Sequence, residues 1–292
     1  MTIRPAAITR KQVAAFVKPR PRDSHKGMFG TVVVIGGAAG MVGAPLLAAR
    51  AALKLGAGCV HAGFLAKGAP AVDMVQPELM LHTALDALQV KADVLAIGCG
   101  LGQAKEAQMM LYEVLQRKIP VVVDADALNL IARDPALQDD VHKRKAATVL
   151  TPHPGEAARL LGCSTADVQA NRTGAIQMLA RKFECGIVLK GADSLCATST
   201  GRLYVNRTGN PGMSSAGMGD VLAGMVAAFI AQGLEADDAM LLAVHLHGAA
   251  GDALAERGIT VGMTASDLTE WARWLLNEML IKSTVRGKPV EP

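Results

Sequence analysis

The sequence predicts an α/β fold in which helices cover both faces of a central, mostly parallel β-sheet. Short apolar runs of strand length alternate with helix-like segments along the chain, which is typical of parallel sheets. Of the 292 residues, 51% are hydrophobic but only 3% aromatic, and 30 are glycine. Small apolar side chains of this kind suit helices that pack closely on buried strands. The composition excludes a disordered chain, and a chain of this length needs no disulfide or metal to fold.

The strands are expected at continuous apolar runs, because parallel strands are buried on both faces. They are Thr31–Gly36, Gly58–Gly63, Asp93–Gly98, Ile119–Asp124, Ala147–Thr151 and Gly186–Lys190. The expected helices are one bracketed by Pro45 at its N1 position and Gly56, then Gln103–Lys118, Pro154–Leu161, Ala166–Phe183, Asp220–Gln232, Ala236–Arg257 and Asp267–Lys282. Ser194–Thr198 and Arg202–Asn206 predict a β-hairpin that extends the sheet antiparallel at one edge. No linker or repeat interrupts the series, so we expect one domain over residues 1–292.

Residues 1–26 form a basic N-terminal arm. The arm has a surplus of six positive charges, whereas the remainder of the chain has a surplus of two negative charges. Thr9 and Gln12 form a potential capping box for a short helix that should end before Pro19. The charges are interspersed, without the aromatic platform of a nucleic-acid site or the apolar core of a secretory signal. We therefore expect no nucleic-acid partner and no export.

The longest uncharged run, Gly27–Ala49, contains six glycines and Pro45. It is interpreted as a strand, a turn and a helix rather than a membrane span. The five cysteines show neither CxxC nor zinc-ligand spacing. Free, buried thiols in a reducing cytoplasm are therefore the expected state.

Four glycine-bearing loops follow expected strands, at the edge of the sheet where ligands bind in open α/β folds. Gly36–Ala44 matches a dinucleotide fingerprint loosely and lacks the later acidic residue, which disfavours a Rossmann dehydrogenase. It fits a tight turn as well as it fits backbone that approaches a ligand. Gly98–Gly102 has alternate glycines that let backbone approach a bound molecule, although alone this is a weak pattern. Cys99 in this loop is interpreted as a buried thiol rather than a nucleophile, because no histidine lies near it in the sequence.

The third loop, Thr151–Glu156, places a histidine between two prolines. Single histidines are usually structural, but His153 follows a strand in the expected crevice and could donate to a substrate oxygen. Glu156 lies in the first helical turn, where the helix dipole favours a carboxylate in any case. Its functional alternative is to hold a magnesium-bound water.

The fourth loop, Gly209–Asp220, has four glycines, has no charge before its last residue, and runs into an apolar helix. The free N–H groups and the positive dipole end of such a helix bind anions. Asp220 at that point could accept a proton while a phosphoryl group is stabilised; the plainer alternative is an N-cap. The glycine content favours the functional interpretation, and the chain has no P-loop sequence. Lys190–Asp193, which ends a strand, offers a cation and flexible backbone to phosphates.

In this order the motifs resemble the ribokinase-like superfamily, in which a GxGD loop forms an anion hole and its Asp is the catalytic base. More specifically, they resemble the nucleotide-dependent NAD(P)H-hydrate dehydratase family. The segments that carry the resemblance are HKGMFGTVVVIGG (25–37), GAPLLAARAALKLGAG (43–58), GCGLG (98–102), DADALN (124–129), TPHPGE (151–156), VLKGADS (188–194) and GNPGMSSAGMGDVLAG (209–224). TPHPGE and GNPGM are the most specific, and the resemblance covers nearly the whole chain.

The resemblance implies a repair reaction on hydrated NADH or NADPH. The ring hydroxyl is phosphorylated and phosphate is then eliminated, with Mg²⁺ as cofactor and with ADP favoured over ATP as donor. Many relatives carry an N-terminal epimerase domain for which this chain has no room, so it should act on one epimer, the S form. The resemblance also implies a homo-oligomer, with a tetramer among the expected forms.

The resemblance further assigns site residues. It makes Asp220 the catalytic base and places the anion hole at Gly217, Met218 and Gly219. The hydrate-binding positions are Ala44, Gly102, His153 and Asp220, the nucleotide-binding positions are Lys190, Gly191, Ala192, Asp193, Ser194 and Gly219, and the expected magnesium contact, through water, is Glu156. The chain departs from the family pattern at Cys99, where GPGLG has a proline. It also departs at Met218, where threonine is common, which puts a hydroxyl contact to phosphate in doubt.

Two alternatives stay open. A kinase of the same fold could act on a hydroxymethylpyrimidine or hydroxyethylthiazole, since fold does not fix function. A non-catalytic nucleotide sensor is the other, although a sensor has no use for the base Asp220. The residues themselves do not distinguish ADP from ATP.

Overall fold

The structure, a computed structural model, describes residues 4–285, with the side chains of residues 282–285 left aside. Within this range ten strands form one sheet in the order β1-β10-β9-β8-β7-β6-β5-β2-β3-β4. The parallel strands are β2 (Thr31–Gly36), β3 (Cys59–Phe64), β4 (Met80–Thr83), β5 (Val94–Ile97), β6 (Val121–Val123), β7 (Thr148–Leu150) and β8 (Gly186–Leu189). The antiparallel hairpin β9 (Leu195–Ala197) and β10 (Leu203–Val205) follows β8, as predicted. β1 (Ala6–Ala7) then pairs parallel with β10.

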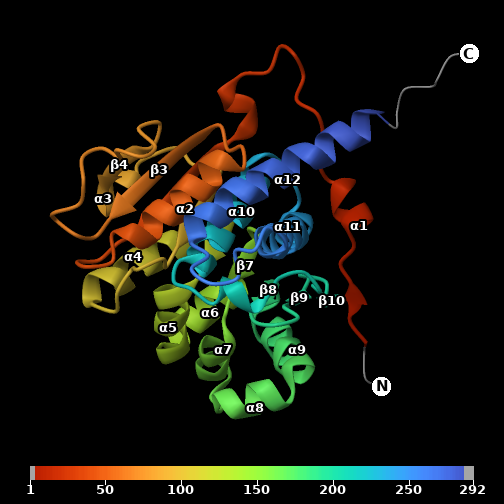
Figure 1. Ribbon diagram of the computed structural model, residues 1–292. Coiled ribbons are helices and arrows are strands. Elements are labelled where there is room, and N and C mark those ends of the chain that lie inside the picture. The colour runs from red at the N-terminus through yellow and green to blue at the C-terminus, as the bar shows by residue number, and fades with distance from the viewer. Residues whose placement is uncertain (1–3, 286–292) are drawn as a thin grey trace, which may run out of the picture.

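Helices cover both faces of the sheet (Figure 1). One layer contains α1 (Arg10–Ala14), α2 (Gly43–Lys54), α10 (Met218–Ala231), α11 (Ala236–Glu256) and α12 (Ala265–Val285). The other contains α3 (Ala84–Ala87), α4 (Lys105–Leu115), α5 (Ala125–Arg133), α6 (Pro135–Lys143), α7 (Pro154–Leu161), α8 (Thr165–Ala170) and α9 (Arg172–Phe183). Side chains alternate between faces along a strand, so Val32 and Val34 of β2 lie in one core and Val33 and Ile35 in the other. Because a buried strand contributes side chains to both cores, successive positions along it are apolar, which explains the continuous apolar runs of the sequence.

The predicted strands are confirmed to within a few residues, but some helices differ from the prediction. The single helix expected over Ala166–Phe183 is two helices, α8 and α9. The break falls at Asn171, whose side chain accepts a hydrogen bond from the Gly174 N–H at 2.9 Å. Asparagine favours such local bonds over a continuous helix. Pro45 is the third residue of α2 rather than its N1 residue, because α2 begins at Gly43.

The basic arm is folded against the body of the protein. Thr9 caps α1 by accepting from the Gln12 N–H, and α1 ends at Ala14, before Pro19 as expected. The Arg20 guanidinium lies over the Phe29 ring, 3.5 Å from its centroid, and donates to the Gly56 carbonyl at the end of α2. The positive charges of the arm are thus partly engaged in structural contacts.

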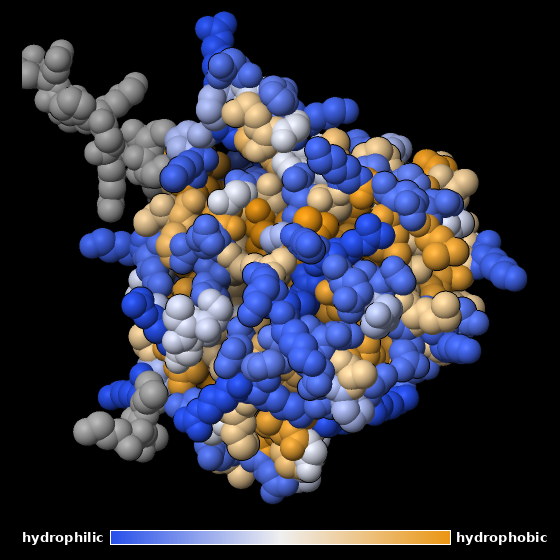
Figure 2. All heavy atoms as spheres, turned by 180° about the vertical axis from the view of Figure 1, so that it is seen from behind, coloured by the Kyte–Doolittle hydropathy of each residue, from blue (hydrophilic) through white to orange (hydrophobic). Residues whose placement is uncertain are grey.

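No helix within residues 4–285 is long and apolar enough to cross a membrane. All five cysteines are free thiols. The expectation that they are buried holds for Cys99, Cys185 and Cys196, but it is wrong for Cys163, which is exposed after the end of α7, and Cys59 is only partly buried. Seen from behind, the surface mixes polar and apolar side chains (Figure 2).

Candidate active site

The loops that follow neighbouring parallel strands meet at one edge of the sheet and bond to each other. Gly37 N–H donates to the Cys99 carbonyl at 3.2 Å, and Ala38 N–H to the Gly100 carbonyl at 2.7 Å. A Cβ atom at Gly36 would lie 2.0 Å from the Cys99 carbonyl oxygen, so this close approach requires glycine. The glycines of the first two loops therefore serve in part to join those loops.

The third and fourth loops are connected at the end of β8. The Lys190 N–H donates to the Pro152 carbonyl at 2.9 Å, which fixes the TPHPGE loop beside the KGADS segment. A Cβ atom at Gly219 would lie 3.0 Å from Lys190 Nζ and 3.4 Å from Asp124 Oδ2. Lys190 thus lies directly against the backbone of the GMGD turn, as a phosphate site requires.

α10 begins at this turn. Gly217 is its N-cap, in the left-handed region with φ 89°, and Asp220 is the third residue of the helix. The N-cap interpretation of Asp220 is therefore wrong: its carboxyl is free for another role. The first N–H groups of a helix have no partner within it, so the amides of Met218 and Gly219 are available to an anion. Because backbone amides rather than side chains would bind the anion, a methionine at position 218 is compatible with anion binding.

α11 holds the fourth loop in place. Asp252 accepts from the Gly209 N–H at 2.9 Å and from the Asn210 side-chain amide at 3.1 Å. His247 Nε2 lies 2.9 Å from the Met218 carbonyl. Burial lowers the pKa of His247 to about 4, so the ring is neutral at neutral pH and its Nε2–H donates to that carbonyl. Neither residue was predicted from the sequence; each is a polar side chain in the mainly apolar stretch of α11 from Ala239 to Leu254, which also contains His245.

A buried ion pair lies at the centre of the site. Lys190 Nζ donates to Asp124 Oδ1 at 2.6 Å, and Asp124 is 1% exposed. Burial disfavours the ammonium, but Asp124 and Glu156 outweigh burial and raise the pKa of Lys190. Asp124 is followed by Ala125 with φ 51°, a conformation that L-residues rarely adopt and that often occurs at functional sites. Asp124 belongs to the DADALN segment, and its role in this ion pair was not predicted from the sequence.

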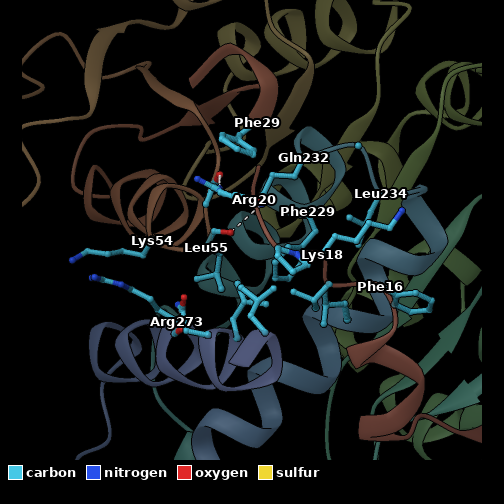
Figure 3. Close-up of a pocket in the computed structure, with 18 of the residues that line it drawn as sticks. Phe16, Lys18, Arg20, Phe29, Lys54, Leu55, Phe229, Gln232, Leu234 and Arg273 are labelled. Carbon is cyan, nitrogen blue, oxygen red and sulfur yellow. Dashed lines mark hydrogen bonds between the residues drawn. The ribbon is translucent and has the colours of Figure 1, made fainter. Parts of the chain in front are cut away.

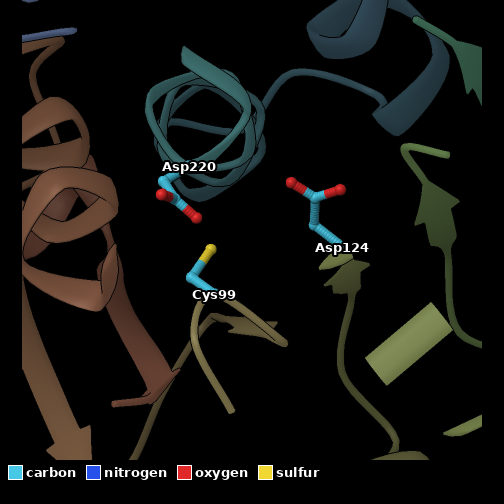
Figure 4. A group of neighbouring side chains, drawn as sticks. All are labelled: Cys99, Asp124 and Asp220. Atoms are coloured by element: carbon cyan, nitrogen blue, oxygen red, sulfur yellow. The ribbon is translucent and has the colours of Figure 1, made fainter. Parts of the chain in front are cut away.

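The carboxyl of Asp220 faces the thiol of Cys99 (Figure 4). One ligand atom each of Cys99, Asp124 and Asp220 lies within 4.8 Å of the other two. Burial raises the pKa of the Asp220 carboxyl to about 6, although a hydrogen bond from the Cys99 thiol opposes the rise. The charges of Asp124 and Asp126 raise this pKa further, and that of Lys190 lowers it.

Cys99 is itself 1% exposed, and burial raises the pKa of its thiol well above the usual value. The interpretation of Cys99 as a buried thiol is therefore confirmed. Asp124 already has the Lys190 ammonium as its cation, and Mg²⁺ prefers oxygen ligands to sulfur. The sulfur atom and the ion pair therefore make this three-residue group a poor fit for a magnesium site.

His153 is the N-cap of α7. Its Nδ1 accepts from the N–H groups of Gly155 and Glu156, and the Glu156 carboxylate accepts from the His153 N–H at 2.7 Å, which completes a capping box. Nδ1 is an acceptor, so Nε2 carries the proton of the neutral ring; Nε2 lies 3.2 Å from Glu156 Oε1. Burial raises the pKa of Glu156 to about 7. Both residues thus have structural roles, and the half-exposed His153 ring keeps an N–H group that could face a substrate.

A cavity of about 590 Å³ opens between the end of β8, the fourth loop and α11. It is lined by all six residues predicted for the nucleotide: Lys190, Gly191, Ala192, Asp193, Ser194 and Gly219. Its size suits a nucleotide-sized ligand. Arg207, on the same cavity, pairs with Asp193 at 2.6 Å.

The residues predicted for the hydrate lie outside that cavity. Ala44 and Gly102 come together around Gly100, since a Cβ atom at Gly100 would lie 3.1 Å from the Ala44 Cβ. Gly102 N–H donates to Asp126 at 2.9 Å. Lys190 and Gly219, the residue before Asp220, line the nucleotide cavity, whereas Asp220 faces Cys99 of the Gly98–Gly102 loop (Figure 4). A larger cavity, about 1000 Å³, lies under the basic arm and contains none of the predicted site residues (Figure 3).

These features define a nucleotide-binding α/β protein of the ribokinase-like fold, with an anion site at a helix N-terminus beside a buried acid and a lysine. The chain belongs to the NAD(P)H-hydrate dehydratase family, whose profile matches residues 32–273. It is 46% identical over 268 residues to the ADP-dependent (S)-NAD(P)H-hydrate dehydratase of Neisseria meningitidis, which covers 90% of each chain.

Other relatives are longer. The bifunctional NAD(P)H-hydrate repair enzyme of Escherichia coli is 41% identical over 271 residues, which is 91% of this chain and 51% of the relative. The chain thus spans about half the length of the bifunctional relatives. Among solved structures, the ADP/ATP-dependent NAD(P)H-hydrate dehydratase of Bacillus subtilis, co-crystallised with ATP and Mg²⁺, has a TM-score of 0.83 and 28% identity and covers 94% of this chain and 99% of its own. A hydroxyethylthiazole kinase of Pyrococcus horikoshii, at 18% identity and a TM-score of 0.61, shares the fold alone.

Proposed function

We propose that this protein is an ADP-dependent (S)-NAD(P)H-hydrate dehydratase. The observation that carries the proposal is the meeting of Lys190 and the first residues of α10, with their free amides, in the wall of a nucleotide-sized cavity, directly before Asp220. The Neisseria relative of that activity matches this chain over 90% of both lengths. A base, a cation and an anion hole are what phosphorylation of a hydroxyl requires.

In the first step, the ring hydroxyl attacks the terminal phosphorus of ADP, and AMP leaves with the bridging oxygen. Asp220 accepts the hydroxyl proton; with a pKa of about 6 it is mostly ionised at pH 7 and can do so. The amides of Met218 and Gly219, in the turn that Gly217 caps, stabilise the transferring phosphoryl group. Lys190 adds a positive charge beside the same group.

In the second step, phosphate leaves with the electron pair of the C–O bond. Loss of a proton from the neighbouring ring carbon then restores the double bond of the reduced nicotinamide. The hydrate is assigned to the side of Ala44, Gly102 and His153, and the nucleotide to the cavity of Lys190–Ser194. This division is supported by the positions of the two sets, because the nucleotide set lines the cavity, whereas Ala44 and Gly102 lie around Gly100.

Mg²⁺ belongs to the proposal as a partner of the nucleotide. Glu156, in contact through water, is the protein residue that we assign to it. The fit is supported by the chemistry of the residue: Glu156 is a buried carboxylate whose raised pKa a nearby cation would lower. When bound, the ion would neutralise charge on the transferring phosphoryl group.

The test is to incubate the protein with hydrated NADH, ADP and Mg²⁺ and to follow absorbance at the reduced-nicotinamide band. We expect the absorbance to rise with release of free phosphate and AMP, and an arm with ATP measures donor preference. A stable phosphorylated product would indicate the kinase alternative. No rise with either nucleotide would contradict the dehydratase.

We also propose that the protein is a homo-oligomer. Large apolar side chains are exposed at the β4 end of the sheet, including Met74 at 85% and Leu85 at 70%. Exposed apolar clusters of this kind mark interaction surfaces. Light scattering coupled to size-exclusion chromatography should give a mass that is a multiple of 30.3 kDa.

A further inference from the structure

Cys99 is where this chain departs from the GPGLG pattern of its family, and the departure lies in the centre of the site. The loop that carries Cys99 follows β5, whereas Asp220 lies in the first turn of α10. Their side chains nevertheless point toward one another (Figure 4), and the thiol sulfur lies within 4.8 Å of a carboxyl oxygen, which places the S–H group to donate to the carboxyl. A proline at 99 has no such donor.

Several charged groups face Asp220 from the surrounding elements. Asp124 and Asp126 come from the turn and helix that follow β6, and Lys190 from the end of β8. His247 of α11 contacts the same turn of α10 through the Met218 carbonyl and is neutral. Among the groups described around the carboxyl, Cys99 is the neutral one that is placed to donate a hydrogen bond to it.

The thiol is suited to this contact because it stays protonated. Cys99 is fully enclosed, and the negative charges of Asp220 and Asp124 add to the effect of burial in raising the pKa of its thiol. It cannot compete as a nucleophile, but an S–H group can donate one hydrogen bond. A carboxylate with one oxygen held in this way keeps the other oxygen free for a substrate hydroxyl.

We propose that Cys99 is a positioning residue for the base, in which its S–H group holds one oxygen of Asp220 and favours the ionised carboxylate. The inference rests on the proposed function for its kinetic consequence, but the contact itself is independent of it.

A packing role is the competing explanation. The backbone of the loop is fixed by other contacts: the Cys99 carbonyl accepts from Gly37 N–H, and Gly36 lies against that same carbonyl oxygen. Replacement of the side chain should therefore leave the loop in place. Cys99→Ala removes the donor, whereas Cys99→Ser keeps an O–H donor of similar size.

The experiment compares the pH dependence of kcat/KM for wild type, Cys99→Ala and Cys99→Ser. Cys196→Ala, at a buried thiol in β9, is the matched control. We expect the alanine variant to shift the acid limb upward by about half to one pH unit, which lowers activity well below the midpoint by roughly three- to tenfold. The serine variant and the control should stay near the wild-type midpoint.

An alanine profile that coincides with wild type would overturn the proposal. So would an equal loss at every pH in both variants, which indicates packing alone. A second measurement separates this inference from the proposed function: carbon NMR titration of the Asp220 carboxyl in the isotopically labelled protein needs no substrate. If wild type lacks dehydratase activity but Cys99→Ala raises the titration midpoint of Asp220, the contact stands and the assigned reaction fails; an unmoved midpoint overturns the contact.

Discussion

Lys190 donates to Asp124 across 2.6 Å, and the pair lies against the α-carbon of Gly219. A lysine ammonium is thereby held next to the first amides of α10 before any phosphate arrives. Preorganised charge of this kind stabilises a transition state with little rearrangement. The pair thus links the KGADS segment, the DADALN turn and the GMGD turn into one unit, to which the proposed mechanism assigns phosphate binding.

Replacement of Asp124 by asparagine should greatly lower the free energy of unfolding, because it breaks this buried ion pair. Lys190 would keep its charge in a mostly buried place without a carboxylate, which costs about 3 kcal/mol or more of unfolding free energy. Urea unfolding measures it, with Arg207→Gln as the control, because the exposed Arg207–Asp193 pair should contribute less than about 1 kcal/mol. If the two variants are equally stable, the buried pair is not structurally important.

Replacement of Asp220 by asparagine should lower turnover by about 100-fold or more, the scale of general-base catalysis. ADP binding, measured by calorimetry, should be nearly unchanged, since the amides and Lys190 remain. Asp139→Asn, at an exposed carboxylate of α6, is the control and should behave as wild type. Near-normal turnover of Asp220→Asn would remove the residue from the role of base.

The same substitution should make the protein more stable at neutral pH. Asp220 has a pKa of about 6 in the folded state against an ordinary 3.8, so the folded state penalises its charged form. The penalty is absent below pH 4, grows as pH rises from 4 to 6, and is fully present above pH 6. Asparagine removes it, and we expect a gain of about 1–3 kcal/mol at pH 7 that vanishes near pH 4. Thermal melts of both proteins across this range test the sign, and a loss of stability at pH 7 contradicts it.

The activity of the wild-type protein should fall below pH 6. The base must be ionised to accept the hydroxyl proton, so kcat/KM should decrease about tenfold per pH unit well below the Asp220 pKa. Steady-state rates from pH 5 to 8 give this limb directly. Asp220→Asn should show a flat profile over the same range, and a limb that persists in that variant belongs to another group.

Loosening the fourth loop from α11 should impair catalysis without touching the reacting groups. Asp252→Ala removes the acceptor of Gly209 and Asn210, and we expect kcat/KM to fall roughly ten- to hundredfold through misplacement of the GMGD turn. Glu256→Ala, one turn further along the same helix and exposed, is the control. A variant with wild-type kinetics would show that the loop holds its shape alone.

Much of the fold could be predicted because the parallel strands are buried on both faces. Thr31–Gly36 is apolar without alternation, and it is β2 to the residue. β4 was missed because it is a short edge strand, and its sequence Met80–Thr83 has no comparable run. The helices α5 and α6, between β6 and β7, were missed as well. The helix prediction over Ala166–Phe183 failed at Asn171, where one side-chain bond decides between one helix and two.

The site could be predicted where its chemistry lies in the backbone. Glycine-rich turns indicate backbone amides that a ligand can reach, so the sequence predicts the GMGD turn and the loop before it. The contacts of Cys99 with Asp220 and of Asp252 with Gly209 join residues far apart in the chain, and no local pattern encodes such pairs. His153 was predicted as a possible substrate contact, but its local sequence makes it the N-cap of α7.

The pairing of β1 with β10 has a practical consequence. Ile8 N–H donates to the Val205 carbonyl, and the chain goes on from Val205 to Asn206 and Arg207 in the wall of the nucleotide cavity. Proteolytic trimming ahead of Arg10 would leave β10 with an unpaired edge, open to association with other chains. Purification tags are therefore better placed away from this end, since β1 pairs with β10, which ends one residue before the wall of the nucleotide cavity.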